Sequence, residues 1–522
     1  MWRSPNHHTR EGTVVEHHRS ANTLGTLLQP YRCMRQMSAA TKTVPATVPA
    51  LAASGLTSVS PNSAISVGNQ RPRNRLSQLI ERLRTENVGA VLARGAATSF
   101  LVGACGTLIS FVAQIILARS IHADQYGEYA YVLSIMNMAV LIGKLEFDPC
   151  SVRFVGAYHG TNNWSMLRGF LRRSHQIVFV ASLTVSAIGG LIIWIKWHSL
   201  STSLARAALA GLLLQPIMAL LSLQLGCLQG LKRIVLAQSP SVVVRPLLFA
   251  IFIFAIVRIG GIGIGAPRAV LLQVVAAAIA LALSAIFLQR AKPKALSTIH
   301  PAFETRLWVR TSLGLMMIAS ANVVLGTQMD VFVVGTFLRP REAGIYGAAS
   351  QLASLISFSV TAIIFIAVPM IAEMHAKHER NGLQRLVSLA TRWALLVSAP
   401  AAALLLVLGP FILRWYGPEF ARGYAPLAVL SVGALLTVPI GALAGFLLTM
   451  TGHERQAGVI VCGTALLNLL LTIVLTPAIG IAGTALATVT AGLIRAGVFA
   501  VYIRRYLAVS VAPFPWARAS SR

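Results

Sequence analysis

Ionisable side chains inside long apolar runs are the residues of this chain that could do chemistry. Arg245 and Arg495 lie well inside two such runs, and Asp330 lies toward one end of a third. Lys144 and Glu146 lie near the end of another. A charge at such a position is costly, and it usually faces a partner or a wet cavity. Cations outnumber acids among these five residues, which favours an anionic ligand such as a diphosphate or an acidic sugar.

Arg245 is the best placed of these cations. It lies about eleven residues into its run, which is roughly 17 Å deep at 1.5 Å per residue and so near the midplane of a bilayer core. Pro246 follows it and is expected to kink the helix and free backbone groups toward a cavity. Arginine binds phosphate through paired, charge-assisted hydrogen bonds. The plainer alternative is that Arg245 and Arg495 pair with acids or cap carbonyl groups.

The remaining candidates divide into two roles. Lys144 and Arg153 join Arg245 and Arg495 as substrate-binding candidates, although Lys144 also fits a side chain that snorkels to the interface. Asp330, Arg119 and Glu146 are the candidates for gating or ion coupling. For Asp330 a structural ion pair is an equally good interpretation.

Twelve apolar runs of spanning length must position these residues. A bilayer core of about 30 Å needs about 20 apolar residues in a helix, and helices satisfy their own backbone groups in lipid. The composition agrees, with 56% hydrophobic and 11% charged residues and a mean hydropathy of +0.70. We predict an all-α integral membrane protein whose spans are approximately residues 95–117, 127–145, 176–195, 204–228, 234–257, 269–288, 311–337, 345–371, 387–409, 424–450, 457–476 and 481–503.

An internal repeat groups the predicted spans. Gly127-Glu-Tyr129 opens the second run and Gly344-Ile-Tyr346 opens the eighth, an offset of 217 residues; two further glycine motifs repeat at offsets of 217 and 222. An even number of spans per repeat makes both halves enter the membrane in the same direction, as in some secondary transporters. We predict two parallel-repeat six-helix lobes, residues 95–290 and 311–505, around a central cavity, with a cytoplasmic linker at 291–310.

Lys and Arg set the predicted orientation. The flanks on one side hold 26 of these residues and the loops on the other side hold 8, so the positive-inside rule places both termini in the cytoplasm. We predict a disordered basic tail at 1–74, an amphipathic interfacial helix at 75–94 and a cytoplasmic tail at 506–522. The net charge of +29 then indicates contact with anionic membrane lipids, and we expect no nucleic acid partner.

Several conspicuous residues have structural interpretations. Glycines 127 and 344 suit a sharp entry from loop to helix, and tyrosines 129 and 346 suit the membrane boundary. Trp308, Trp393, Trp415 and Tyr416 are interpreted as interfacial anchors. The five cysteines show no C-x-x-C spacing, and neither a disulfide, a metal site nor a cofactor is expected.

Three stretches of the chain resemble bacterial polysaccharide flippases. They are residues 119–153, residues 328–369 with Gly335 and Gly344-x-Tyr346, and residues 468–488. The resemblance covers nearly all of 94–505 and concerns the oligosaccharide exporter branch of the MATE-like (MOP) superfamily. It implies a Wzx-type flippase of the bacterial inner membrane that carries a polyprenyl-diphosphate-linked (undecaprenyl) oligosaccharide for O-antigen, capsule or exopolysaccharide synthesis. It also implies a polysaccharide polymerase and chain-length proteins as partners. The long basic tail departs from the family.

Three other classes fit less well. A MATE-like drug or metabolite antiporter shares the fold and topology but usually carries coupling acids in its first lobe, where we single out only Glu146, near a span end. A major-facilitator transporter carries a basic loop motif after its second helix, which residues 147–153 do not match. A membrane enzyme needs an extramembrane catalytic surface, and the predicted outer loops are short, without Walker, metal-ligand or nucleophile motifs. We therefore predict a transporter and not an enzyme.

Overall fold

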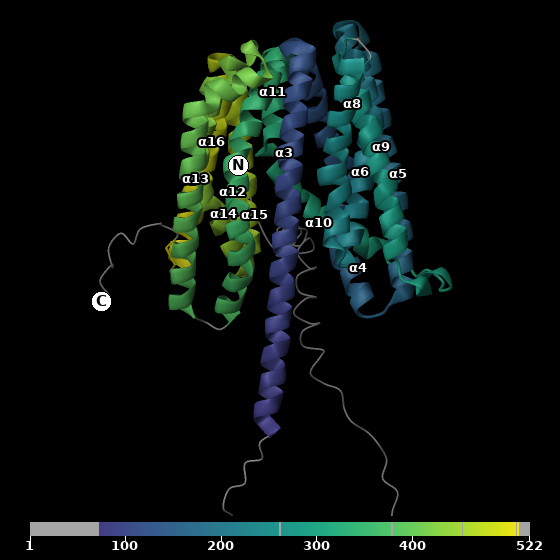
Figure 1. Cartoon of the computed structure of the whole chain (residues 1–522), viewed down its shortest axis with the longest axis vertical. Helices are drawn as coiled ribbons and strands as arrows, with labels where there is room; N and C mark the ends of the chain where they lie inside the picture. Colours follow the sequence, from purple (N-terminus) through teal and green to yellow (C-terminus); the bar gives the residue numbers. More distant parts are fainter. Residues whose placement is uncertain (1–72, 260–262, 377–378, 452, 508, 511–522) are drawn as a thin grey trace, which may run out of the picture. The chain divides into compact units, whose positions relative to one another are not determined.

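Long helices build the structure, as the apolar runs require. The computed structural model describes residues 73–259, 263–376, 379–451, 453–507 and 509–510, and every regular element among them is a helix (Figure 1). The chain divides into two compact units, Met1–Arg82 and Leu83–Arg522, and all contacts described below lie in the second. Nearly all of the tail predicted at 1–74, and most of that at 506–522, lie outside the described residues.

Among the described residues, the first half of the chain contains seven α-helices and a π-helical turn. Residues 75–94, predicted as a separate interfacial helix, belong to α3. The elements are α3 (Arg73–Lys144), α4 (Phe147–Gly160), α5 (Trp164–Ile195), α6 (Thr202–Gly230), α7 (Ile234–Gln238), the π-helical turn η4 (Ser239–Val244), α8 (Arg245–Ile259) and α9 (Ala266–Ala291), with a 3₁₀ turn, η3, at Trp197–Ser199.

A break at His122 divides α3. The helix has 72 residues, which at 1.5 Å per residue would be about 108 Å long, more than three bilayer cores. His122 leaves the helical region with φ 60° and ψ 169°, a left-handed backbone that few residues other than glycine adopt. The break falls between the predicted runs 95–117 and 127–145, so these two runs are separate segments within one long helix.

In the second half, the residues that the structure describes form seven α-helices. The predicted run 311–337 is not one helix: α10 ends at Val324, and the extended backbone of Gly326 (φ −97°, ψ 163°) separates it from α11. The elements are α10 (Thr305–Val324), α11 (Thr327–Phe337), α12 (Pro340–Ala376), α13 (Arg380–Tyr416), α14 (Tyr424–Met450), α15 (Glu454–Ile479) and α16 (Ile481–Tyr506), with 3₁₀ turns η5 (Lys294–Ser297) and η6 (Pro418–Gly423).

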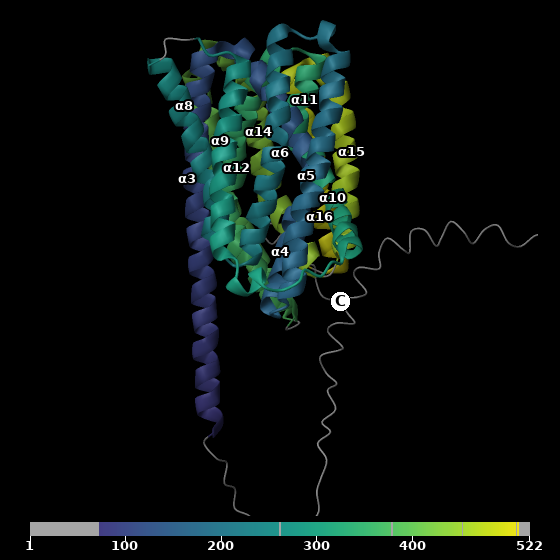
Figure 2. The same ribbon diagram turned by 90° about the vertical axis from the view of Figure 1, so that its right-hand side faces the viewer.

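Ten helices in the described part of the chain are long and apolar enough to cross a membrane, where twelve were predicted. One of the ten is the stretch Thr98–Gly160, 63 residues long, which includes the break at His122. Helix α6 packs against α9, and α14 packs against α16 (Figures 1 and 2). Large apolar side chains such as Trp194 (74% exposed) and Val407 (75%) face outward, as a surrounding lipid phase requires. The chain is an all-α, multi-pass membrane protein.

The predicted linker 291–310 is packed against the first half of the chain. Arg168 donates to the carbonyl of Ile299 at 2.5 Å, and the backbone N–H of Ala302 donates to the carbonyl of Ser165 at 3.1 Å. Trp308, at the start of α10, is completely buried against Phe170, and its indole N–H donates to the Tyr158 hydroxyl at 3.0 Å. The prediction that Trp308 is an interfacial anchor is therefore wrong, because this ring fills a protein core.

Of the other predicted anchors, one is buried and two are exposed. Tyr416 is fully buried beside Phe420, so its interpretation as an anchor is also wrong, whereas Trp393 and Trp415 are 52% and 44% exposed. Indole and phenol rings fill protein cores as well as interfaces, and composition alone does not distinguish the two places.

Candidate functional site

Arg245 lies at a cavity of about 280 Å³ between the two halves of the chain. Gly106, Thr107, Ser110 and Phe111 of α3 line one side, Ser241 and Val242 of η4 lie beside Arg245, and Gln351, Ser354 and Leu355 of α12 line the other side. Five of these neighbours are hydroxyl or amide residues. The cavity therefore offers one cation and several neutral hydrogen-bonding groups, supplied by segments more than 100 residues apart in sequence.

The Arg245 guanidinium is largely unpartnered. Its Nη1 lies 3.4 Å from the Met218 sulfur, which is a weak acceptor, and its buried Nε has no hydrogen-bond partner in the described part of the chain. Within the described ranges no carboxylate forms an ion pair with it. The alternative that Arg245 is neutralised by an acid finds no support in this geometry, and a buried cation without an anion is costly unless a ligand supplies one.

An irregular helix positions Arg245. The π-helical turn Ser239–Val244 ends immediately before it, and α8 begins at Arg245 itself. Pro240 and Pro246 lack the backbone N–H that an α-helix needs at these positions, which explains why the regular ladder is interrupted here. The irregularity expected at Pro246 is present, but it takes the form of a wider turn on the N-terminal side of Arg245.

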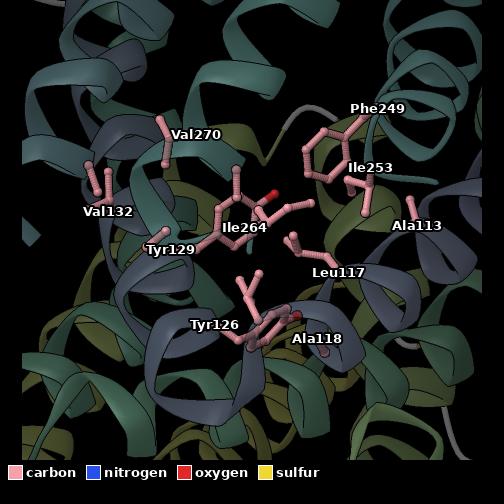
Figure 3. Packing of buried hydrophobic residues seen from close by; sticks show 14 of the residues in the cluster. Ala113, Leu117, Ala118, Tyr126, Tyr129, Val132, Phe249, Ile253, Ile264 and Val270 are labelled. Carbon is pink, nitrogen blue, oxygen red and sulfur yellow. The ribbon is translucent and has the colours of Figure 1, made fainter. Parts of the chain in front are cut away.

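A buried cluster holds α8 against the break in α3 (Figure 3). Leu117, before the break, and Tyr126 and Tyr129, after it, pack with Phe249 and Ile253 of α8. The rings of Tyr129 and Phe249 are stacked with centroids 6.1 Å apart. This packing fixes the first turn of α8, and with it the guanidinium, relative to α3.

Arg495 is separate from this cavity. It lies on α16, partly buried, and does not line the cavity of Arg245. Arg495 follows Thr488 by seven residues, so the two side chains share a helix face about 10 Å apart along the axis. The structure therefore does not join Arg495 to Arg245 in one cationic site.

Lys144, Glu146 and Asp148 neutralise one another at the junction of α3 and α4. The Lys144 Nζ lies 2.7 Å from Glu146 Oε1 and 2.8 Å from Asp148 Oδ2. Glu146 has a left-handed backbone, with φ 55° and ψ 34°, which turns its carboxylate back to the lysine. Arg153 lies on α4, five residues after Asp148. It is exposed, and its guanidinium carbon lies 5.5 Å from the centre of the Phe154 ring. The geometry thus gives Lys144 two protein anions as partners.

Asp330 is 2% exposed and accepts two hydrogen bonds from other helices. The hydroxyls of Tyr346 on α12 and Thr488 on α16 each lie 2.9 Å from its Oδ2, while its Oδ1 forms no hydrogen bond with any residue that the structure describes. No cation forms an ion pair with Asp330 in the portion of the chain described, which removes support from the structural ion-pair alternative. Asn468, whose amide donates to the Val324 carbonyl at 3.3 Å, ties α15 to the end of α10.

Arg119 contributes to a set of contacts between the halves of the chain near the α3 break. Its Nε donates to the Trp415 carbonyl at 2.6 Å. Arg341 lies between two carboxylates, 3.9 Å from Asp124 and 3.2 Å from Glu419. The ring of Tyr126 packs against Phe420 with centroids 5.4 Å apart. These contacts, which we call the outer contacts after the side that the sequence predicts for them, join the two halves of the chain near the α3 break.

Sequence reasoning missed several of these groups. Gln351 and Ser110 line the cavity, but neutral residues in apolar runs give no signal that separates cavity lining from helix packing. Arg341 is one of the eight Lys and Arg residues of the predicted outer loops, and nothing in the sequence distinguishes it from the others. Glu128 was overlooked as an acid of the first six runs; its carboxylate accepts from the hydroxyls of Ser201 and Ser203. Its position directly after Gly127 was the available signal.

Fold and site together define a multi-pass α-helical membrane protein with a polar, cationic cavity between its halves. Residues 92–375 match the family described as polysaccharide biosynthesis protein. This match covers more than half of the chain, and the chain belongs to that family. The predicted resemblance to the polysaccharide flippases is confirmed at the level of the family.

Two curated relatives share part of the sequence. The uncharacterized membrane protein EpsK of Bacillus subtilis is 25% identical over 188 residues, which are 35% of this chain and 37% of EpsK. The probable low-salt glycan biosynthesis flippase Agl15 of Haloferax volcanii is 23% identical over 182 residues, 35% of this chain and 38% of Agl15. The aligned part thus spans well under half the length of either relative.

Solved structures share the fold over most of the chain. A multidrug resistance MATE family transporter of the MOP superfamily, in an inward-facing conformation, has a TM-score of 0.63 at 12% identity and covers 78% of this chain and 98% of its own. The lipid II flippase MurJ, in an inward closed conformation, has a TM-score of 0.59 at 16% identity, with coverage of 80% and 87%. At these identities the likeness concerns the fold alone.

Proposed function

We propose that this protein is a flippase that moves an undecaprenyl-diphosphate-linked oligosaccharide from the inner to the outer leaflet of the bacterial inner membrane, for surface polysaccharide synthesis. Arg245 carries the proposal. Its guanidinium is a partly buried cation at a polar cavity with no protein anion against it among the described residues, so a diphosphate is the ligand that would complete it.

The proposed topology has twelve crossings in two lobes. The 63-residue stretch Thr98–Gly160 crosses twice, turning at His122, and α12, with 37 residues, crosses once more. With the other nine spanning helices this makes twelve. The 26 Lys and Arg on one set of flanks against 8 on the other support cytoplasmic termini. The outer contacts around Arg119 and Arg341 then lie on the periplasmic side.

Alternating access between the lobes is the proposed mechanism. The outer contacts support a state closed to the periplasm, in which the cavity receives the head group from the cytoplasmic side while the polyprenyl tail stays in lipid. Opening requires Arg119 to release the Trp415 carbonyl and Arg341 to release Asp124 or Glu419. Such exposed polar contacts are weak, so a modest differential in ligand affinity between the states can shift the equilibrium.

Asp330 is the proposed coupling residue. Its Oδ1 is free for a proton or a cation, and its partners come from α12 and α16. Loading or unloading this carboxylate changes the packing of three helices at once. A carboxylate held in a bilayer-spanning region without a counter-charge is costly, which makes it responsive to an ion supplied by a gradient.

The second candidate, a MATE-like drug or metabolite antiporter, is supported by the likeness in fold. The cavity lining argues against cationic drugs, because Arg245 is the charged residue among the side chains that line it. The two candidates are distinguished by measuring, in the same membranes, whether the protein transports the lipid-linked sugar or a cationic dye.

The test replaces Arg245 in a strain that lacks its own flippase. Removing one partner of a buried charged contact typically costs about 3 kcal/mol, equivalent to more than about a hundredfold in rate, so Arg245→Ala should nearly abolish transport. Arg245→Lys keeps the charge without the bidentate fork and should retain partial activity. The control is Arg422→Ala, since that side chain is 72% exposed. Full activity of Arg245→Ala at normal membrane levels would refute the anionic-substrate argument.

A further inference from the structure

We infer that Gly127 and Gly344 are the closing surface of an outer gate, and that their missing side chains set the balance between the closed and open states of the periplasmic side. This inference rests on the proposed alternating access. The sequence suggested that these glycines permit a sharp loop-to-helix entry. That interpretation is wrong, because both lie inside helices, α3 and α12, and neither has a positive φ.

Close approach of two backbones is what these positions require. A Cβ added to Gly344 would meet the Cα of Gly127 at 2.7 Å and its N at 2.8 Å. A Cβ added to Gly127 would meet the carbonyl oxygen of Pro340 at 2.0 Å and the Cα of Arg341 at 2.7 Å. Backbone atoms cannot move aside as a flexible side chain can, so any side chain here must separate α3 from α12.

The repeat explains why these two glycines meet. They are separated by 217 residues, which is the offset of the internal repeat. Asp124 and Arg341, which form the neighbouring ion pair, are also 217 residues apart. Where a two-fold axis relates two similar units, equivalent positions contact each other only at the axis. Two such pairs in succession support a pseudo-two-fold axis that passes through this crossing.

Contacts between α3 and α11 continue the approach of the two halves beside the glycine crossing. Tyr131 of α3 packs on Gly335 of α11, where a Cβ would lie 2.2 Å from the ring, and its hydroxyl lies 3.1 Å from Thr336 Oγ1. Further along, the Asn137 amide donates to Gln328 at 3.1 Å. The polar contacts are exposed and individually weak, while the glycine crossing is buried and steric. The steric contact therefore decides how completely this side shuts.

The experiment measures access to the cavity from each side of the membrane. In a cysteine-free background, Ser354→Cys in the cavity is labelled with a membrane-impermeant thiol reagent, applied outside to spheroplasts and inside to inverted vesicles. Gly127→Val and Gly344→Ala should raise outside labelling by at least about tenfold and lower inside labelling, a shift of the two-state population. The matched control is Gly463→Val on α15, where an added Cβ meets nothing within 4 Å.

A second variant guards against a folding defect. Arg341→Glu sets a like charge against Asp124 and Glu419 and should raise outside labelling while both glycines keep their hydrogen side chains. Unchanged outside labelling in Gly127→Val with normal transport, or an equal rise in Gly463→Val, would overturn the gate. A rise on both sides would indicate unfolding and would also count against it. If the glycine variants shift the labelling but the parent protein moves no lipid-linked sugar, the proposed function is refuted while the gate is supported.

Discussion

Ionisable residues in this protein differ in whether the protein itself neutralises them. Lys144 has two carboxylates within 3 Å, whereas no oppositely charged partner of Arg245 or Asp330 lies within the described ranges. A charge that its neighbours neutralise has the geometry of a structural contact, and a charge left open has the geometry of a ligand site. This distinction separates candidates that look alike in the sequence, where all three are charges within apolar runs.

Asp330→Asn tests the coupling role at this scale. The amide oxygen can still accept the hydroxyls of Tyr346 and Thr488, so the fold should survive while the charge is lost. If the carboxylate carries the coupling ion, transport driven by an ion gradient should fall by at least about tenfold, with little change in thermal stability. Thr488→Val is the control that removes one hydrogen bond and keeps the charge. Gradient-driven transport at the parent rate in Asp330→Asn would assign Asp330 a structural role.

Helix boundaries at the scale of elements were only partly predictable. The lengths of the apolar runs predicted that the helices exist, because the thickness of the bilayer fixes how long a spanning helix must be. It did not give the continuity of α3, since a single left-handed residue at His122 replaces the loop that was expected. The division of α10 from α11 at Gly326 was also missed, because both sides of the break are apolar.

The sequence predicted which residue types form the candidate site, but it did not predict which of these residues lie together. The sequence identified Arg245 from its depth and from Pro246, and the irregular turn before it agrees. It could not say that Arg495 lies apart from that cavity, because side-chain direction around a helix depends on which neighbours pack against it. Gln351 and Ser110 were invisible for the same reason.

Helix α10 joins the two halves, and Trp308 is its attachment to the first. The indole is completely buried and bonded to Tyr158, so Trp308→Ala should cost about 3–5 kcal/mol of stability. Thermal unfolding in detergent should show the loss as a lower midpoint. Trp393→Ala, where the ring is 52% exposed, should leave the midpoint nearly unchanged. An equal effect of the two changes would mean that Trp308 behaves as an interfacial residue after all.

Orientation and mechanism meet at the scale of the whole molecule. The outer contacts serve as a periplasmic gate only if they face the periplasm, and the charge bias of the flanks predicts that they do. Reporter fusions at Arg290 and Arg380 should therefore read as cytoplasmic, and fusions at Lys196 and Pro418 as periplasmic. Pro418 opens η6, the turn that carries Glu419 of the outer contacts.

The same orientation can be checked without fusions. Asp124 is 69% exposed, so Asp124→Cys in the cysteine-free background should react with an impermeant thiol reagent from the periplasmic side and not from the cytoplasmic side. Labelling only from the cytoplasm, together with a periplasmic signal at Arg290, would mean that the orientation of the protein is the reverse of the predicted one. The outer contacts would then close the cytoplasmic side, and Arg245 would face the outer leaflet in this state. A flippase that loads its substrate at the inner leaflet would then have to begin its cycle from the opposite conformation.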